Sequence, residues 1–273
     1  MKTLAHLSDL HFGRTDPAVL EPLRAKLHAL QPHLIVVSGD LTQRARKEQF
    51  EEAVAYLESL PGPQLVVPGN HDVPLYNVVK RFLSPLGNYK RIVTDDLDPA
   101  HIDDEMAVVG VNTARSNVFK GGRINMEQVE AIKARLCELP EGITKIVVTH
   151  HPFDAPKNSD EEDQIVGRAK KALEELAGCG ADLLLAGHLH ASAVSHTADR
   201  YAIAGLSALV VQAGTATSTR QRGEPNSFNV LRVQDNHIEV DRLVFNDTEF
   251  VVASTQAFDH DAEGWKEGAI HHG

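Results

Sequence analysis

Short apolar runs alternate with amphipathic segments through the first two-thirds of the chain. This alternation is typical of strands and helices that take turns in an α/β fold. The runs that we expect to form strands lie at residues 4–7, 34–37, 65–67, 107–111, 146–148 and 183–185. The pattern therefore predicts an α/β architecture in this part of the chain.

Three of the intervening segments carry apolar residues at helical spacing. The first begins after Asp16, which can cap a helix, and a proline that suits the first helical position. The second covers residues 50–60 and is stopped by the Pro-Gly-Pro sequence at 61–63. The third opens with Asn125 and Gln128, which together resemble a capping box. We expect all three helices to face the core.

The sequence pattern changes from about residue 191 onward, where short strand-like runs alternate with turn residues. The runs at 208–212, 227–233 and 238–245 predict a β-rich second half. From about residue 256 the chain is polar and lacks periodicity, which predicts a frayed tail or a lid. The expected organisation is one domain over residues 1–255 and a tail or lid over residues 256–273.

Charge and composition narrow the class of protein. The formal net charge of -11 argues against sequence-independent binding of duplex nucleic acid, because such binding depends on clustered Lys and Arg. A small anionic substrate remains compatible if bound cations supply local positive charge. The sequence shows no signal peptide and no apolar run of roughly 20 residues, so we expect no membrane span and a cytoplasmic location.

The chain has two cysteines, Cys137 and Cys179. They have neither the number nor the spacing of a disulfide framework or a thiolate metal site. We therefore expect both to be buried, reduced thiols.

Polar motifs follow five of the apolar runs, where loops at strand ends collect ligands in α/β sheets. The motifs are Asp9-Leu10-His11, Gly39-Asp40, Gly69-Asn70-His71-Asp72, Thr149-His150-His151-Pro152 and Gly187-His188-Leu189-His190. In the first and last, side chains two apart in an extended segment should point the same way. The carboxylate, amide and imidazole groups suit Mn, Fe, Zn or Co rather than a structural zinc. A single motif is a weak signal, but five in order predict a metal site.

The series D-x-H, G-D, G-N-H-D, H and G-H-x-H, over residues 9–190, resembles the calcineurin-like metallophosphoesterases. The G-N-H-D form and the chain length are most similar to the class III cyclic nucleotide phosphodiesterases and the related glycerophosphodiesterases. The resemblance implies a four-layer α/β/β/α sandwich with two metal ions at the sheet edges. Carried over by motif, the first metal would be bound by Asp9, His11 and His190, the second by Asn70, His150 and His188, and both by Asp40.

Physical reasoning supports such a pair of ions. Two cations about 3.5–4 Å apart can share a hydroxide, neutralise phosphate oxygens and stabilise both oxygens of an in-line displacement. Asp40 is a suitable bridge, because its carboxylate offers one oxygen to each ion. We expect His150 rather than His151 to be a ligand, because the ligand in this family directly follows the strand, although an exchange between the two stays open.

Two further residues of the third motif are expected to assist catalysis. His71 is not needed as a ligand and should lie beside the phosphate, where it can donate to the developing charge or to the leaving oxygen. Asp72 could orient the His71 ring. It could equally cap a helix ahead of Pro74, and the sequence does not separate these two roles.

Two loops could shape a substrate pocket. Residues 112–123 include Arg115 and Lys120, and residues 219–226 include Arg220 and Arg222. Arginine side chains in such loops can contact a phosphate or a base. The simpler interpretation is a solvated loop or an oligomer contact, because exposed charge is common.

The leading functional hypothesis is a dinuclear metal-dependent phosphodiesterase that hydrolyses a small anionic phosphodiester by attack of a metal-bridging hydroxide. A 3′,5′-cyclic nucleotide such as cAMP is the first candidate substrate. A glycerophosphodiester, another diester or a phosphomonoester is the alternative, because metal-site motifs do not determine the leaving group. A non-catalytic scaffold is disfavoured because no ligand is lost, and a nuclease because the chain is acidic and lacks a capping domain. A homodimer is compatible with the sequence.

Overall fold

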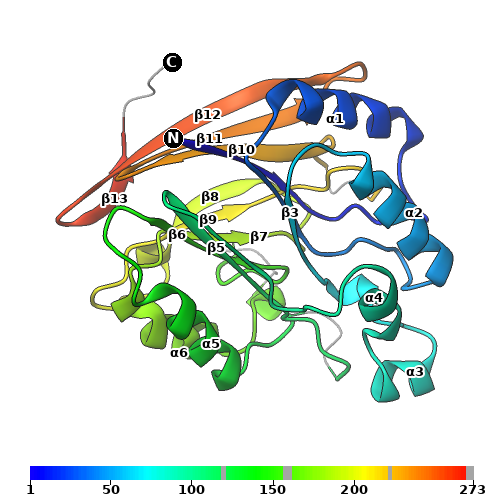
Figure 1. Cartoon of the computed structure of the whole chain (residues 1–273), viewed down its shortest axis with the longest axis horizontal. Helices are drawn as coiled ribbons and strands as arrows, with labels where there is room; N and C mark the ends of the chain where they lie inside the picture. Colours follow the sequence, from blue (N-terminus) through cyan, green and yellow to red (C-terminus); the bar gives the residue numbers. More distant parts are fainter. Residues whose placement is uncertain (118–120, 156–161, 221–222, 269–273) are drawn as a thin grey trace.

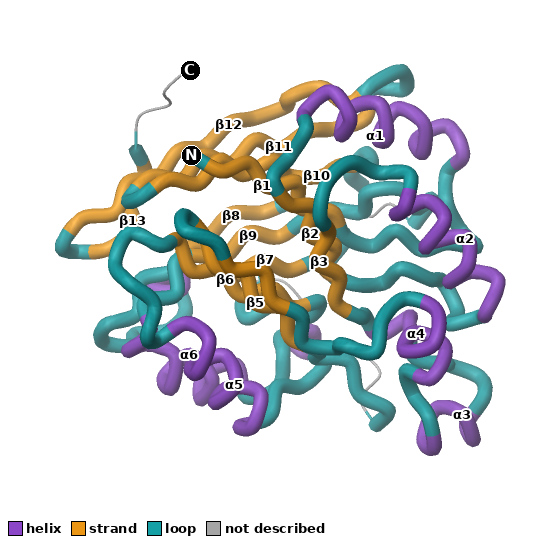
Figure 2. Tube along the Cα trace, viewed as in Figure 1, coloured by secondary structure: helices purple, strands orange, loops and turns teal. Residues whose placement is uncertain are grey.

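The computed structural model describes residues 1–117, 121–155, 162–220 and 223–268. Two mixed β-sheets pack face to face, and helices cover the outer face of each sheet (Figures 1 and 2). This arrangement confirms the predicted α/β/β/α sandwich.

The first sheet has seven strands and contains both ends of the described chain. Its strands, in spatial order, are β13 (Gly264–Glu267), β12 (Phe250–Asp261), β11 (His237–Phe245), β10 (Ser227–Gln234), β1 (Lys2–Leu7), β2 (Leu34–Ser38) and β3 (Gln64–Val67). The strands β1, β2 and β3 are parallel, whereas β10 pairs antiparallel with β1. The carboxyl ends of β1, β2 and β3 therefore meet at one edge.

The second sheet has six strands. In spatial order they are β4 (Ala100–Ile102), β5 (Met106–Val111), β6 (Thr144–Thr149), β7 (Leu183–Ala186), β9 (Leu209–Gln212) and β8 (Ala193–His196). The four central strands are parallel, and the two edge strands pair antiparallel with them. All six runs predicted as strands in the first two-thirds of the chain form strands, which confirms that prediction.

Six α-helices occur among the described residues: α1 (Pro17–Leu30), α2 (Lys47–Glu58), α3 (Val78–Leu83), α4 (Gly87–Ile92), α5 (Met126–Leu136) and α6 (Ala169–Leu176). The Asp16 side chain accepts the N–H of Ala18 at the start of α1, and Asn125 forms the predicted capping box with Gln128 at the start of α5. Short 3-10 helices are η1 (Asn70–Asp72), η2 (Glu162–Gln164), η3 (Ala177–Cys179) and η4 (Thr197–Asp199). Within the described ranges, no helix has the length and apolarity needed to cross a bilayer.

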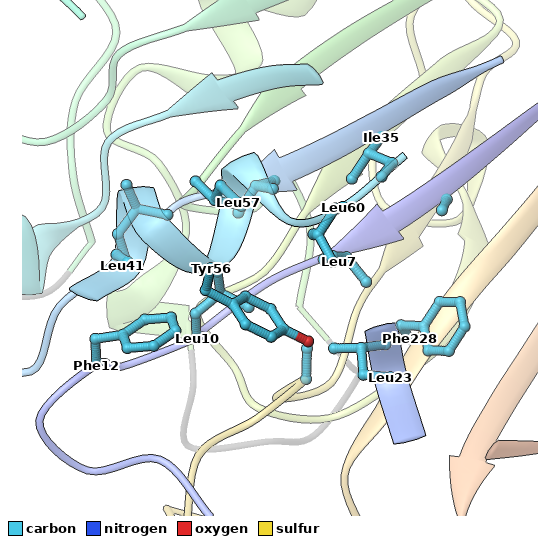
Figure 3. Packing of buried hydrophobic residues seen from close by; sticks show 14 of the residues in the cluster. Leu7, Leu10, Phe12, Leu23, Ile35, Leu41, Tyr56, Leu57, Leu60 and Phe228 are labelled. Carbon is cyan, nitrogen blue, oxygen red and sulfur yellow. The ribbon is translucent and has the colours of Figure 1, made fainter. Parts of the chain in front are cut away.

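Buried apolar side chains fill three layers, one between the sheets and one under each group of helices. Strand alternation explains why β2 is apolar throughout: Leu34 and Val36 face the second sheet, while Ile35 and Val37 face the helices. Figure 3 shows part of the layer beneath α1 and α2, where Tyr56 lies among leucines and its hydroxyl donates to the Leu20 carbonyl at 2.8 Å.

The prediction of a frayed tail or lid from residue 256 onward is wrong for residues 256–267. β12 continues to Asp261 and β13 follows it, so residues 256–267 form the outer edge of the first sheet. Phe258 and Trp265 pack into the layer between the sheets. Pairing of β12 with β11 and of β13 with β12 orders this polar segment, and such pairing is not visible in local composition. Residues 269–273 lie outside the described part of the chain.

The expectation of two reduced thiols is also wrong. Cys137, at the end of α5, forms a disulfide with Cys179 in η3, and their Cα atoms are 4.2 Å apart. The two residues are separated by 42 positions in the sequence, so their proximity depends on the packing of α5 beside α6. Only Cys179 is buried.

Candidate metal centre

The five polar motifs come from both sheets and meet where the parallel strands end. Each contributes at least one side chain to the same place: Asp9 and His11 after β1, Asp40 after β2, Asn70 in η1 after β3, His150 after β6, and His188 and His190 after β7. All of these side chains are buried except that of Asn70, which is half-buried. The sequence-predicted ligands are therefore brought together without exception.

A first group consists of Asp9, His11 and His190. Nε2 of His11 lies 3.4 Å and Nε2 of His190 lies 3.2 Å from Oδ1 of Asp9, and the two nitrogens are 3.4 Å apart. Ligand atoms bonded at ~2.1 Å to one ion lie roughly 3.0–3.4 Å from one another in octahedral or tetrahedral geometry. The three atoms therefore fit around a single cation.

A second group consists of Asn70, His150 and His188. Oδ1 of Asn70 lies 3.0 Å and Nδ1 of His188 lies 3.3 Å from Nε2 of His150. These separations also suit ligands that share one ion. The group combines an amide oxygen with two imidazoles, a mixture that transition metals accept.

Asp40 lies between the two groups. Its Oδ2 is 3.7 Å from Nε2 of His11 and 3.4 Å from Nε2 of His150, whereas its Oδ1 accepts the backbone N–H of His71 at 2.7 Å. This geometry does not favour the expectation that each carboxylate oxygen of Asp40 binds its own ion. One oxygen faces both groups, because the other is held by the backbone.

The charges and unpaired atoms of the centre suit a cation. Oδ1 of Asp9 is buried without a hydrogen-bond partner, an arrangement that is costly unless something positive pairs with it. Burial opposes ionisation of this carboxyl, but His190 and His11 outweigh burial and hold the pKa of Asp9 well below its usual value. Burial, aided by His150, lowers the pKa of His188 to about 3, so its imidazole is neutral and can donate a lone pair.

Hydrogen bonds on the far side of two rings fix their tautomers. Nδ1 of His150 donates to the Ser38 carbonyl at 2.7 Å, and Nδ1 of His190 donates to the Arg220 carbonyl at 2.9 Å. Carbonyl oxygens only accept, so the Nε2 lone pair of each ring is directed into the centre. Although burial disfavours the charged form, Asp40 raises the pKa of His150 to about 9, so an incoming metal ion would displace a proton there.

The backbone of the motifs is not extended, contrary to the sequence-based expectation. Left-handed φ angles occur at five of the residues that form the centre: Asp9 (54°), His11 (51°), Asp40 (53°), His188 (71°) and His190 (58°). Such conformations are unfavourable for residues with a Cβ and tend to cluster at functional sites. Tight turns after β1, β2 and β7 therefore contribute to the convergence.

A glycine permits the closest approach between two of the motif loops. A Cβ on Gly69 would overlap Oδ1 and the backbone nitrogen of Asp40. The backbone of Gly69 itself is not left-handed, so only the lack of a side chain is required here. The glycine that precedes Asn70 thus brings the third motif against the second.

His71 lies beside the centre. Its ring meets the His11 ring edge to face at a centroid distance of 4.8 Å. Its Nδ1 donates to the Gln43 carbonyl at 3.0 Å, and its Nε2 lies 2.8 Å from Nη1 of Arg220. The sequence did not indicate the contacts to Gln43 and Arg220, because one uses a main-chain atom and the other a distant loop.

Of the two roles left open for Asp72, orienting the His71 ring is not supported by its hydrogen bonds. Its buried carboxylate accepts backbone N–H groups from Leu41, Thr42 and Gly69, as well as the Thr42 hydroxyl. The Gly69 contact caps η1, which is closer to the capping alternative. Burial, with the nearby Asp40 carboxylate, raises the pKa of Asp72 to about 7.

His151 lies next to the second group, with a ring nitrogen within 4.8 Å of ligand atoms of His150 and His188. Its Nδ1 is 2.8 Å from Oγ1 of Thr113, and its ring packs against the His188 ring at a centroid distance of 4.7 Å. Of these two histidines, His150 is the one that approaches both Asn70 and Asp40. The geometry therefore favours His150 over His151 as the ligand.

Of the two loops expected to shape a pocket, the second reaches the centre through Arg220. Arg115 in the first loop is held by the Asn112 and Ala114 carbonyls and by Gln128. Lys120 and Arg222 lie outside the described residues.

Comparisons with known proteins agree with this geometry. The model of the calcineurin-like phosphoesterase family matches residues 2–192. The 3′,5′-cyclic adenosine monophosphate phosphodiesterase CpdA of Escherichia coli K12 is 25% identical over 212 residues, which cover 68% of this chain and 69% of that protein. The glycerophosphodiester phosphodiesterase GpdQ of Enterobacter lignolyticus is 34% identical over 80 residues, 25% of this chain and 29% of that one.

Two solved structures share the fold at low sequence identity. Purple acid phosphatase PPD1 from yellow lupin has a TM-score of 0.72 at 12% identity; the match covers 96% of this chain but only 54% of the lupin protein, so this chain spans about half its length. A dimetal phosphatase from Danio rerio has a TM-score of 0.63 at 13% identity, with 93% and 98% covered. Since the family model spans most of the sequence and its two-metal motifs converge in the structure, this protein belongs to the calcineurin-like phosphoesterase family.

Proposed function

We propose that the protein is a dinuclear metal-dependent phosphodiesterase. The observation that carries this proposal is the position of Oδ2 of Asp40 between two groups of ligand atoms. We assign Asp9, His11 and His190 to one ion, Asn70, His150 and His188 to the other, and Asp40 to both. Nitrogen and oxygen donors without thiolate suit Mn, Fe, Zn or Co.

Two bound cations would supply Lewis acidity and lower the pKa of water. The protein itself holds the proton donor. The Nδ1 hydrogen of His71 is committed to the Gln43 carbonyl, so Nε2 is the atom that can deliver a proton to a leaving oxygen. His71 is fixed beside Asn70 in η1, which places this donor next to one proposed ion.

We propose a small phosphodiester as substrate, with a 3′,5′-cyclic nucleotide of the cAMP type as the first candidate. The similarity to CpdA over two-thirds of the chain supports this choice. The net charge of -11 also suits a small substrate better than a polymeric anion.

A glycerophosphodiester is the second candidate. A cavity of about 130 Å³ lies beside Asn70 and His71, and Gln43, Arg44 and Leu75 contribute to its walls. This volume is well below the ~300–1,000 Å³ of pockets that enclose drug-sized ligands. It suits a leaving group as small as glycerol, and the local similarity to GpdQ supports the same candidate.

The test is hydrolysis of 3′,5′-cAMP by Mn²⁺-loaded protein, with Asp40→Ala as the inactive variant. The control is Asp104→Ala, because the Asp104 side chain is 90% exposed, in the turn before β5. Turnover that Asp40→Ala abolishes and Asp104→Ala preserves would support a cyclic nucleotide phosphodiesterase. Turnover only of glycerophosphodiesters would favour the second candidate, and near-normal turnover by Asp40→Ala would contradict the two-metal assignment.

A further inference from the structure

We propose that Arg220 binds the phosphoryl group of the substrate and, in doing so, releases His71 to act on the leaving oxygen. This inference rests on the proposed function, because it assigns a substrate contact within the same site. It concerns a residue that lies outside the five metal-binding motifs.

The side chain of Arg220 hydrogen-bonds to Nε2 of His71, the nitrogen that the proposed proton transfer requires. Nη1 of Arg220 lies 2.8 Å from Nε2 of His71. Because Nδ1 of His71 donates to the Gln43 carbonyl, Nε2 is the acceptor and the guanidinium is the donor. His71 is therefore held in place by Gln43, and its Nε2 is engaged by Arg220.

The main chain of Arg220 is anchored on the other side of the centre. Its carbonyl accepts the Nδ1 hydrogen of His190, and its N–H donates to Oγ of Ser218 at 3.0 Å. Ser218 in turn pairs with Thr15 in an isolated β-bridge. Arg220 thus makes two contacts at the centre. Its backbone contacts His190, a proposed ligand of one ion, and its side chain contacts His71, which adjoins Asn70, a proposed ligand of the other ion.

A phosphoryl oxygen is a stronger acceptor than a neutral imidazole. Because a phosphoryl oxygen is anionic, its hydrogen bond with the guanidinium carries an opposite-charge attraction that a bond with a neutral imidazole lacks. The planar fork of arginine can also donate two bonds to one phosphate. Substrate binding should therefore draw the guanidinium from Nε2 of His71 onto the phosphoryl group. The freed Nε2, which carries no proton while it accepts from Arg220, can then take up a proton from water and donate it to the leaving oxygen.

Other arginines near the centre are arranged differently. Arg81 donates to the Ser116 and Pro74 carbonyls, and Arg44 stacks over the Tyr76 ring at 5.3 Å. Both side chains line the cavity beside Asn70 and His71, and these contacts are with main-chain carbonyls and a tyrosine ring. Arg220 is the arginine for which the structure records a contact with the proposed proton donor.

The experiment is calorimetric titration of inorganic phosphate into Mn²⁺-loaded protein, together with the kinetics of whichever diester the protein hydrolyses. The variants are Arg220→Ala and Arg220→Lys, both of which retain the carbonyl that His190 uses. The control is Arg14→Ala: the backbone of Arg14 holds the same loop, but its side chain is exposed. Metal content and melting temperature establish that each variant is folded and loaded.

We expect Arg220→Ala to weaken phosphate binding 10- to 100-fold and to raise KM, with two metal ions retained. Arg220→Lys should recover part of the affinity, and Arg14→Ala should bind phosphate within twofold of the wild type. Wild-type affinity in Arg220→Ala, or no phosphate binding by the wild type, would overturn the inference.

The two proposals can fail separately. Arg220-dependent phosphate binding without hydrolysis of any diester would support the role of Arg220 and contradict the proposed function. If the protein hydrolyses a diester and Arg220→Ala leaves KM, kcat and phosphate affinity unchanged, the role of Arg220 is overturned. The proposed function would then remain intact.

Discussion

The carboxylate of Asp72 accepts both the backbone N–H and the hydroxyl of Thr42, at 2.9 and 3.0 Å. It also accepts one further N–H from the loop after β2 and one from the turn after β3. A single buried carboxylate therefore ties the loop that carries Asp40 to the segment that carries Asn70. The relative position of the two proposed metal ligands depends on this connection.

Replacing Asp72 with Ala should destabilise the protein and weaken metal binding. Four donors would lose their acceptor, and one buried unsatisfied group costs about 1–3 kcal/mol, so we expect a loss of at least ~3 kcal/mol in unfolding free energy. Urea unfolding and Mn²⁺ titration measure the two effects. Asp199→Ala is the control, because Asp199 caps η4 by the same kind of contact at an exposed site. A loss below ~1 kcal/mol with normal metal affinity would contradict the connecting role.

Gly69→Ala should displace Asp40 and so reduce metal affinity at least tenfold. The added methyl group would overlap both the carboxylate and the backbone of Asp40, neither of which is the free end of a flexible side chain. Metal titration and turnover provide the measurements. Gly178→Ala is the matched control, since a Cβ at Gly178 meets nothing within 4 Å. Equal behaviour of the two variants would mean that the close approach of the loops is not needed.

The strands, the first helices and the order of the motifs could be predicted because their signals are local. The apolar run at 34–37 became β2 (Leu34–Ser38), and Asp16 capped α1 as its position indicated. In contrast, the polar segment at 256–267 forms strands because β12 pairs with β11 and β13 pairs with β12. The pairing of Cys137 with Cys179 likewise depends on helix packing across 42 positions.

The contrast between local sequence signals and features that depend on the folded structure also applies to the candidate metal centre. Residue types and spacing identified the side chains of the two groups, including Asp9 and His150. They could not identify the Ser38 carbonyl that orients His150, because a main-chain acceptor leaves no mark in the sequence. The left-handed turn at Asp9 was equally hidden, since an aspartate after a strand is compatible with several backbone conformations.

The disulfide between Cys137 and Cys179 predicts that the folded, oxidised protein has no free thiol. Closing a loop of 42 residues restricts the unfolded chain, so reduction should lower the unfolding free energy by up to about 4 kcal/mol. Thiol titration and urea unfolding with and without reductant test this. Cys137→Ser should make stability insensitive to reductant. Two reactive thiols in protein purified without reductant would show that the bond does not form.

His71 and Asn70 are adjacent in η1 but should fail in different ways when replaced by Ala. Loss of His71 removes the proton donor, so turnover should fall by about 10²–10⁴-fold while two metal ions remain bound. Loss of Asn70 removes an oxygen that lies 3.0 Å from Nε2 of His150, so one metal equivalent should be lost together with turnover. Metal analysis and steady-state kinetics distinguish the two variants. If His71→Ala also loses metal, its imidazole is a ligand and the proton-donor assignment is wrong.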